Sequence, residues 1–181
     1  EFKEIGSDFD ASLLARGLDT IRQTVCIAGS LDESFGINLA RSLTSIAETY
    51  PITIIGMPTW DGISEFSKSE YKNVEITYTT PFYYARANNL GYKIASEFES
   101  ITKGRPTDMF YRGYETTLRF ALLLLDTGKD VASNLTRPGN YVFTSFDIQP
   151  VFLNKQNMTL DYFENKKLYF VRYLNGAKTV Q

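Results

Sequence analysis

The first residues that could bind a ligand lie in the segment GSLDES, residues 29–34. The segment follows the apolar run TVCIAG and precedes a stretch of helical periodicity, so Ser30 and Asp32 stand where a strand passes into a helix. A serine at such a point can cap the helix and, with the free backbone N–H groups, hold an anionic group such as a carboxylate. Helix capping alone, with acidic side chains that complement the helix dipole, explains the same residues.

Three further segments combine aromatic and polar residues. Trp60, the only tryptophan, lies in GMPTWDG, where its ring could stack on a ligand or fill the space between a loop and a helix. Tyr83 lies in the aromatic segment TTPFYYAR and offers contact area with one polar group to a ligand or partner. Tyr114 and Glu115 lie in GRPTDMFYRGYETT, just before an apolar run.

The missing residue types exclude much catalytic chemistry. The chain has no histidine and one cysteine, so it cannot form a Ser-His-Asp triad, a Cys-His dyad, a Cys/His zinc site or an internal disulfide. Neither a dinucleotide-binding GxGxxG motif nor a P-loop is present. A carboxylate pair such as Asp32 and Glu115 could support hydrolysis, but nothing in the spacing brings the two together. We therefore expect a protein that is not an enzyme and that uses no metal and no cofactor.

Composition limits the class of protein and of partner. A length of 181 residues with 43% hydrophobic residues suits one domain with a full-sized core. Nineteen basic and 21 acidic residues give a net charge of −2 without a basic block, so a nucleic-acid partner is not expected. No segment approaches the roughly 20 apolar residues of a membrane-spanning helix. The chain begins EFKEIGS, without Met or a signal peptide, and we expect it to be a piece of a longer protein.

Hydrophobic periodicity predicts the elements that position these residues. Short apolar runs alternate with amphipathic stretches in the first two thirds of the chain, and alternating aromatic and β-branched residues follow. The predicted elements are a helix over 10–22, strand–helix units over 24–50, 52–70 and 73–102, a helix over 109–127 and antiparallel strands within 138–175.

Alternating strands and helices predict an α/β fold with a mostly parallel sheet and helices on both faces. We expect a single flavodoxin-like lobe, a three-layer α/β/α sandwich of strand order 2-1-3-4-5, that ends in antiparallel strands. In such sheets ligands bind outside the carboxyl ends of the strands. This rule selects the loops that contain Ser30, Trp60, Tyr83 and Tyr114.

A resemblance to a known family lies in three longer segments: VCIAGSLDESFGINLARSLTSIAETYPITIIGMPTWDGI, TYTTPFYY and FESITKGRPTDMFYRGYETTLRFALLLLDTG. They resemble the second lobe of type I periplasmic binding proteins, the Leu/Ile/Val-type substrate-binding components of ABC transporters. The resemblance covers residues 3–175. It is closest to a Bacteroidetes branch whose members often carry peptidoglycan-binding LysM repeats upstream.

The resemblance implies a non-catalytic binding domain in the periplasm or elsewhere in the extracytoplasmic cell envelope, including lipoproteins. In the family two lobes close on a small ligand, often an amino acid. Carried over residue by residue, the family's contacts fall on Ser30, Tyr83, Tyr114 and Glu115, and the acid would meet an ammonium group. Glu115 stands where the family has Asp.

The family's first lobe is missing from the sequence, so we expect it, or other domains of the parent chain, among the partners. One alternative is an interaction or scaffold domain at the cell wall, with a vestigial cleft. Another is a small hydrolase that uses carboxylates. An exposed apolar hinge face would favour a homodimer.

Overall fold

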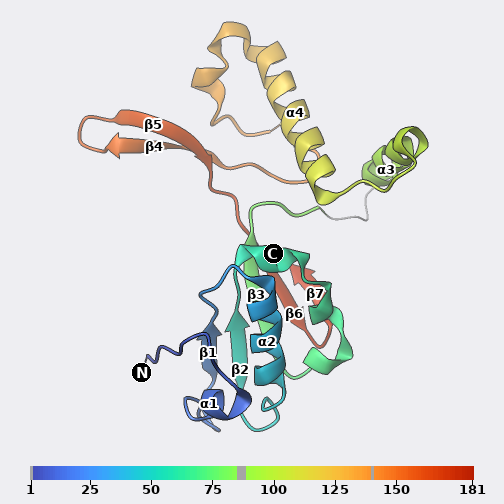
Figure 1. Cartoon of the computed structure of the whole chain (residues 1–181). Coiled ribbons are helices and arrows are strands. Elements are labelled where there is room, and N and C mark those ends of the chain that lie inside the picture. The colour runs from blue at the N-terminus through green and yellow to red at the C-terminus, as the bar shows by residue number, and fades with distance from the viewer. Residues whose placement is uncertain (1, 85–88, 140) are drawn as a thin grey trace. The chain divides into compact units, whose positions relative to one another are not determined.

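The computed structural model describes residues 2–84, 89–139 and 141–181, which form two compact units (Figure 1). Unit 1 consists of Glu1–Thr80 and Tyr169–Gln181, and unit 2 consists of Pro81–Leu168. Where the sequence predicts one lobe, the chain therefore leaves the first unit after its third strand and returns to it 88 residues later, the length of unit 2. No helix of the described residues is long and apolar enough to cross a membrane.

Unit 1 is built on a five-stranded sheet of order β1-β2-β3-β6-β7. The first three strands pair in parallel, and the last two join them in antiparallel fashion. The predicted α/β class is confirmed, but β2 and not β1 lies in the middle of the parallel strands, which corrects the expected order 2-1-3-4-5. The strands are β1 (Thr24–Ile27), β2 (Ile52–Ile55), β3 (Glu75–Thr80), β6 (Tyr169–Leu174) and β7 (Ala177–Val180).

The hydrophobic core of unit 1 lies on one face of this sheet. Helix α2 (Glu33–Thr44) supplies Leu39, Ala40 and Leu43 to a core that also contains Ile54 and Ile76. On the opposite face Val25, Ile27 and Ile55 are exposed, and Ile27 pairs with Ile55 across the two strands. The predicted three layers are therefore not seen within unit 1, because the helices that follow β3 belong to unit 2.

Of two predicted helices of unit 1, one is shorter than expected and the other is replaced by 3₁₀ turns. Helix α1 covers only Ala11–Ala15 of the predicted range 10–22. Gly17 lies just after this helix. The Asp19 side chain then accepts hydrogen bonds from the backbone N–H groups of Ile21 and Arg22, and such bonds compete with the hydrogen bonds of a helix. In the predicted strand–helix unit 52–70, three 3₁₀ turns stand in place of the helix: η1 (Pro58–Gly62), η2 (Ser64–Ser67) and η3 (Ser69–Tyr71).

Unit 2 contains two helices and a hairpin. Helix α3 covers Asn89–Thr102, and the part of the predicted unit 73–102 over residues 85–88 lies outside the described residues. Helix α4 covers Asp108–Thr127 and is followed by the 3₁₀ turns η4 (Gly128–Asp130) and η5 (Ala132–Asn134). Strands β4 (Ile148–Asn154) and β5 (Thr159–Asn165) pair in antiparallel fashion in a sheet of their own.

Candidate functional site

The loops that follow β1 and β2 meet at the carboxyl edge of the sheet in unit 1. Thr59 Oγ1, in the loop after β2, donates a hydrogen bond of 3.0 Å to the carbonyl oxygen of Leu31, in the loop after β1. Ser30 Oγ accepts a hydrogen bond of 3.2 Å from the backbone N–H of Asp32. We call Ser30, Leu31, Asp32 and Thr59 the β1–β2 rim. These hydrogen bonds fix the two loops to each other.

Asp32 is the N-cap of α2. Its carboxylate accepts hydrogen bonds of 2.9 Å from both the backbone N–H and the hydroxyl of Ser34. Ser30 differs, because among the described residues its hydroxyl hydrogen has no acceptor. The structure therefore gives Asp32 the capping role, and it leaves Ser30 one donor for a ligand.

We expect the Asp32 cap to weaken only in acid. Hydrogen bonds from the Ser34 side chain and backbone lower the pKa of Asp32 below its ordinary value of 3.8. Because the folded pKa is the lower one, the stabilisation is complete above the unfolded pKa and is lost as the pH falls through the folded value. An NMR titration of the Ser34 amide should show its midpoint below 3.8. Asp32→Asn, which retains an N-cap side chain, should abolish this transition, and a midpoint at the ordinary value would contradict the expectation.

Trp60 lies in the core of unit 1 and is 0% exposed. Its ring packs so closely on Gly56 and Gly36 that a Cβ built at these glycines would lie 2.1 Å and 2.6 Å from ring atoms. Phe66 adds a ring contact with a centroid distance of 5.3 Å. Trp60 is therefore a packing residue, and its burial gives no support to stacking on a ligand.

Glu115 is buried in unit 2, where it holds a loop. It is 2% exposed, and its Oε1 atom accepts hydrogen bonds of 2.9, 2.6 and 2.7 Å from the backbone N–H groups of Val142, Phe143 and Thr144. The Thr144 hydroxyl donates to the other oxygen. We call residues 142–144 the clamped loop. The carboxylate is engaged by the protein itself, so neither an ammonium ligand nor a catalytic partner such as Asp32 has support from its position.

Arg119 follows Glu115 by one helical turn and was not among the predicted site residues. It is 3% exposed, and its guanidinium donates to the carbonyl oxygens of Gly139, Leu135 and Arg137 and lies 4.9 Å from the ring centroid of Phe146. A single cation inside the run LRFALLLL is the sequence signal that could have identified it, because a charge within an apolar helical stripe must find partners.

Tyr114 lies beside an aromatic cluster at the start of α4. Its side chain is 38% exposed, and its ring centroid lies 6.3 Å from that of Phe110 and 6.5 Å from that of Phe143. In the same cluster Tyr84 stacks on Tyr111, with their ring centroids 4.0 Å apart. Tyr114 is thus open to a partner, whereas its neighbour Glu115 is not.

The predicted site residues fall into separate groups. Ser30 and Asp32 share the β1–β2 rim of unit 1, whereas Tyr83, which is half-buried, Tyr114 and Glu115 belong to unit 2. Within the described part of the chain, no three His, Cys, Asp or Glu side chains are grouped so that they could hold a metal ion. Comparison of the chain with protein-family models, curated proteins and solved structures gives no match.

Proposed function

We propose that this chain is a non-catalytic binding domain that takes a small zwitterionic ligand, such as an amino acid, at the β1–β2 rim. The observation that carries the proposal is the hydrogen bond between Thr59 and Leu31, which preorganises two loops at the carboxyl ends of parallel strands. Ligands of open α/β sheets bind at this edge. A rim fixed before the ligand arrives loses less conformational entropy on binding.

The chemistry of the rim suits both ends of an amino acid. The Ser30 hydroxyl can donate to a carboxylate, while the exposed acidic side chains of Asp32 and Glu33 attract an ammonium group. The exposed side chain of Leu31 offers an apolar contact between them. The same acids disfavour phosphate, which makes a nucleotide a poor ligand for this edge.

The resemblance to type I periplasmic binding proteins supports an extracytoplasmic setting for this function. In the proposal the chain derives from an α/β lobe of a two-lobed receptor of the cell envelope. A first lobe would then complete the site, since burial of a ligand between two halves is the source of affinity in such proteins.

A second candidate is an interaction domain at the cell envelope whose amino-acid pocket is vestigial. The hydrogen bonds between Glu115 and the clamped loop favour this candidate. The resemblance assigns this acid to the ammonium group of a ligand, but its carboxylate binds backbone N–H groups of the protein. In this case the exposed ring of Tyr114 would contact a macromolecular partner. A small hydrolase based on carboxylates has no comparable support.

A titration of the chain with amino acids distinguishes the two candidates. We expect saturable NMR shifts of the backbone amides of Ser30 and Leu31, and an increase in Kd of about tenfold in Ser30→Ala, from the loss of one hydrogen bond to a charged group. Thr59→Val, which unlinks the loops, should also weaken binding. Ser45→Ala is the matched control, since this serine caps the far end of α2. If no amino acid shifts the rim amides, the interaction domain becomes the better proposal.

A further inference from the structure

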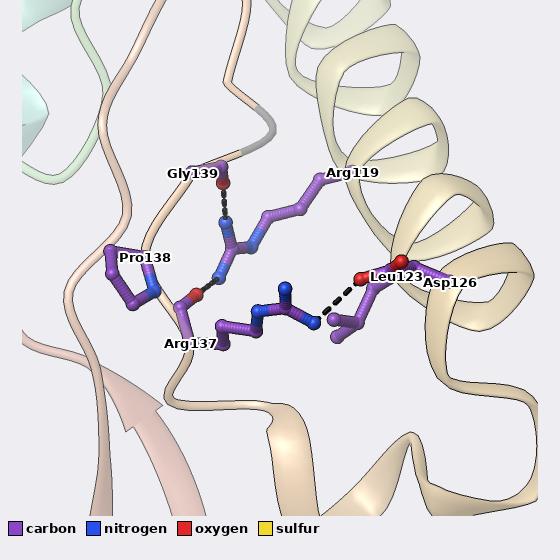
Figure 2. Close-up of a pocket in the computed structure, with 6 residues that line it drawn as sticks. All are labelled: Arg119, Leu123, Asp126, Arg137, Pro138 and Gly139. Atoms are coloured by element: carbon purple, nitrogen blue, oxygen red, sulfur yellow. Dashed lines mark hydrogen bonds and ion pairs between the residues drawn. The ribbon is translucent and has the colours of Figure 1, made fainter.

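Unit 2 contains a cavity of about 100 Å³ between α4 and the segment after η5 (Figure 2). It is separate from the β1–β2 rim and plays no part in the function proposed above. A water molecule takes up about 30 Å³ in the liquid, so the cavity has room for a group of three or four heavy atoms. Its walls are Arg119, Leu123 and Asp126 of α4 and Arg137, Pro138 and Gly139 of the following segment.

The positive charge of Arg119 has no counter-ion among the residues that the structure describes. All acceptors of its guanidinium are neutral backbone carbonyls, and no carboxylate of the described residues forms an ion pair with it. Glu115, one turn away, uses its oxygens on the clamped loop. A buried cation without a counter-ion is costly, and burial alone lowers the pKa of Arg119.

The Nε–H group of Arg119 is the unused donor. The Nε atom is buried and has no hydrogen-bond partner. An unsatisfied buried donor is costly, so such groups in native proteins normally meet a ligand, a water or an ion. Figure 2 shows the two guanidinium groups lying near each other, that of Arg119 turned to the carbonyl oxygens of Gly139 and Arg137 and that of Arg137 turned to Asp126.

Arg137 provides a second, exchangeable cation. Its Nη1 atom lies 2.5 Å from Asp126 Oδ2, and both side chains of this ion pair are more than half exposed. Exposed ion pairs contribute little to stability, so the Arg137 guanidinium can bind another anion in place of Asp126 at little cost.

We propose that this cavity is a binding site for one small carboxylate, held between the Nε–H group of Arg119 and the guanidinium of Arg137. A planar carboxylate matches the fork of N–H donors that guanidinium groups present, and it supplies the charge that the buried arginine lacks. Asp126 competes with the ligand for Arg137. Leu123 and Pro138 add apolar side chains to the lining, and the volume of about 100 Å³ suits a group of acetate size.

The direct test follows the Arg119 Nε–H signal by NMR during titration of the intact chain with sodium acetate, at constant ionic strength maintained with chloride. We expect a saturable shift of this signal. Asp126→Asn should tighten acetate binding about twofold to fivefold, since it removes the competing ion pair. Arg137→Gln should weaken binding about tenfold or more. Arg119 itself is left unchanged because its hydrogen bonds hold the segment 135–139 in place.

Arg105→Gln is the matched control, since this exposed arginine lies outside the cavity. The variant should bind acetate as the parent chain does. The proposal is overturned if acetate produces no saturable shift, if chloride produces the same shift, or if Arg137→Gln and Arg105→Gln respond alike. Both variants change exposed side chains, so amide spectra that match the parent chain will show that they fold.

Discussion

Glu115→Ala is expected to lower the free energy of unfolding by about 3–5 kcal/mol, because a buried carboxylate that accepts hydrogen bonds from three backbone N–H groups and one hydroxyl is lost. The substitution removes the acceptor of the backbone N–H groups of the clamped loop, which are part-buried at Val142 and Phe143 and buried at Thr144. Each unsatisfied donor costs about 1–3 kcal/mol, whereas the lost side-chain contacts add little. Chemical denaturation, together with amide hydrogen exchange at Val142, Phe143 and Thr144, measures the effect.

Two further variants show whether the carboxylate is the cause. Glu115→Gln keeps one acceptor oxygen and should lose less stability than the alanine variant. Glu97→Ala removes an exposed acid from α3 and should change stability little. If Glu97→Ala and Glu115→Ala have equal effects, or if hydrogen exchange in the clamped loop stays slow in Glu115→Ala, the loop is held by other contacts.

Trp60→Ala is expected to lower the free energy of unfolding by about 3–5 kcal/mol, because it opens a cavity in the core of unit 1. The ring fills the space between β2 and α2, where Gly56 and Gly36 leave room for it. Thermal and denaturant unfolding monitored by far-UV circular dichroism provide the measurement. Tyr92→Ala, at an exposed aromatic residue of α3, is the control and should have little effect.

Adding a side-chain atom at Gly56 tests the packing of this glycine against the Trp60 ring. Gly56→Ala would place a Cβ 2.1 Å from Trp60 Cε3 and should destabilise the chain by about 1–3 kcal/mol. Gly29→Ala is matched to it, because a Cβ there meets no atom within 4 Å. Equal stabilities of the two glycine variants would contradict the close fit of the tryptophan ring.

Local signals placed α4 to within one residue of its observed bounds. Thr107 is the N-cap, and Gly128 ends the helix with a φ of 53°. An apolar run such as the one before this glycine is typical of a buried helix, yet Leu122, Leu124 and Leu125 are exposed. The buried stripe of α4 consists of residues one turn apart, and two of them are Glu115 and Arg119. The positions of hydrophobic residues cannot predict which face of a helix is buried when two of the buried residues are charged.

Strand β7 was not predicted, although its signal is present. Asn175 and Gly176 form a two-residue hairpin between Leu174 and Ala177, and both have positive φ, at 53° and 76°. An Asn-Gly pair is the typical sequence of such a turn. The strand order, in contrast, depends on the pairing of β3 with β6 across all of unit 2, and no local pattern encodes it.

For the candidate site, too, features set by neighbouring residues were predicted and contacts between residues far apart in the sequence were not. Ser30 and Asp32 were placed correctly at the end of β1, because a strand-to-helix transition is a local feature. The role of Glu115 depends on a loop 27 residues further along the chain, counted from Glu115 to Val142. Distant partners of this kind decide whether an acid binds a ligand or the protein itself.

The pairing of β3 with β6 also sets an order of events during synthesis. Strand β3 leaves the ribosome before unit 2 and acquires its second neighbour only when β6 has followed. Until then the backbone N–H and C=O groups along that edge are open to strands of other nascent chains, a known route to aggregation. Rapid folding of unit 2 would shorten this exposed interval by bringing the two halves of the sheet together early. Recovery of soluble protein should therefore depend on how fast unit 2 folds, even where the final stability is unchanged.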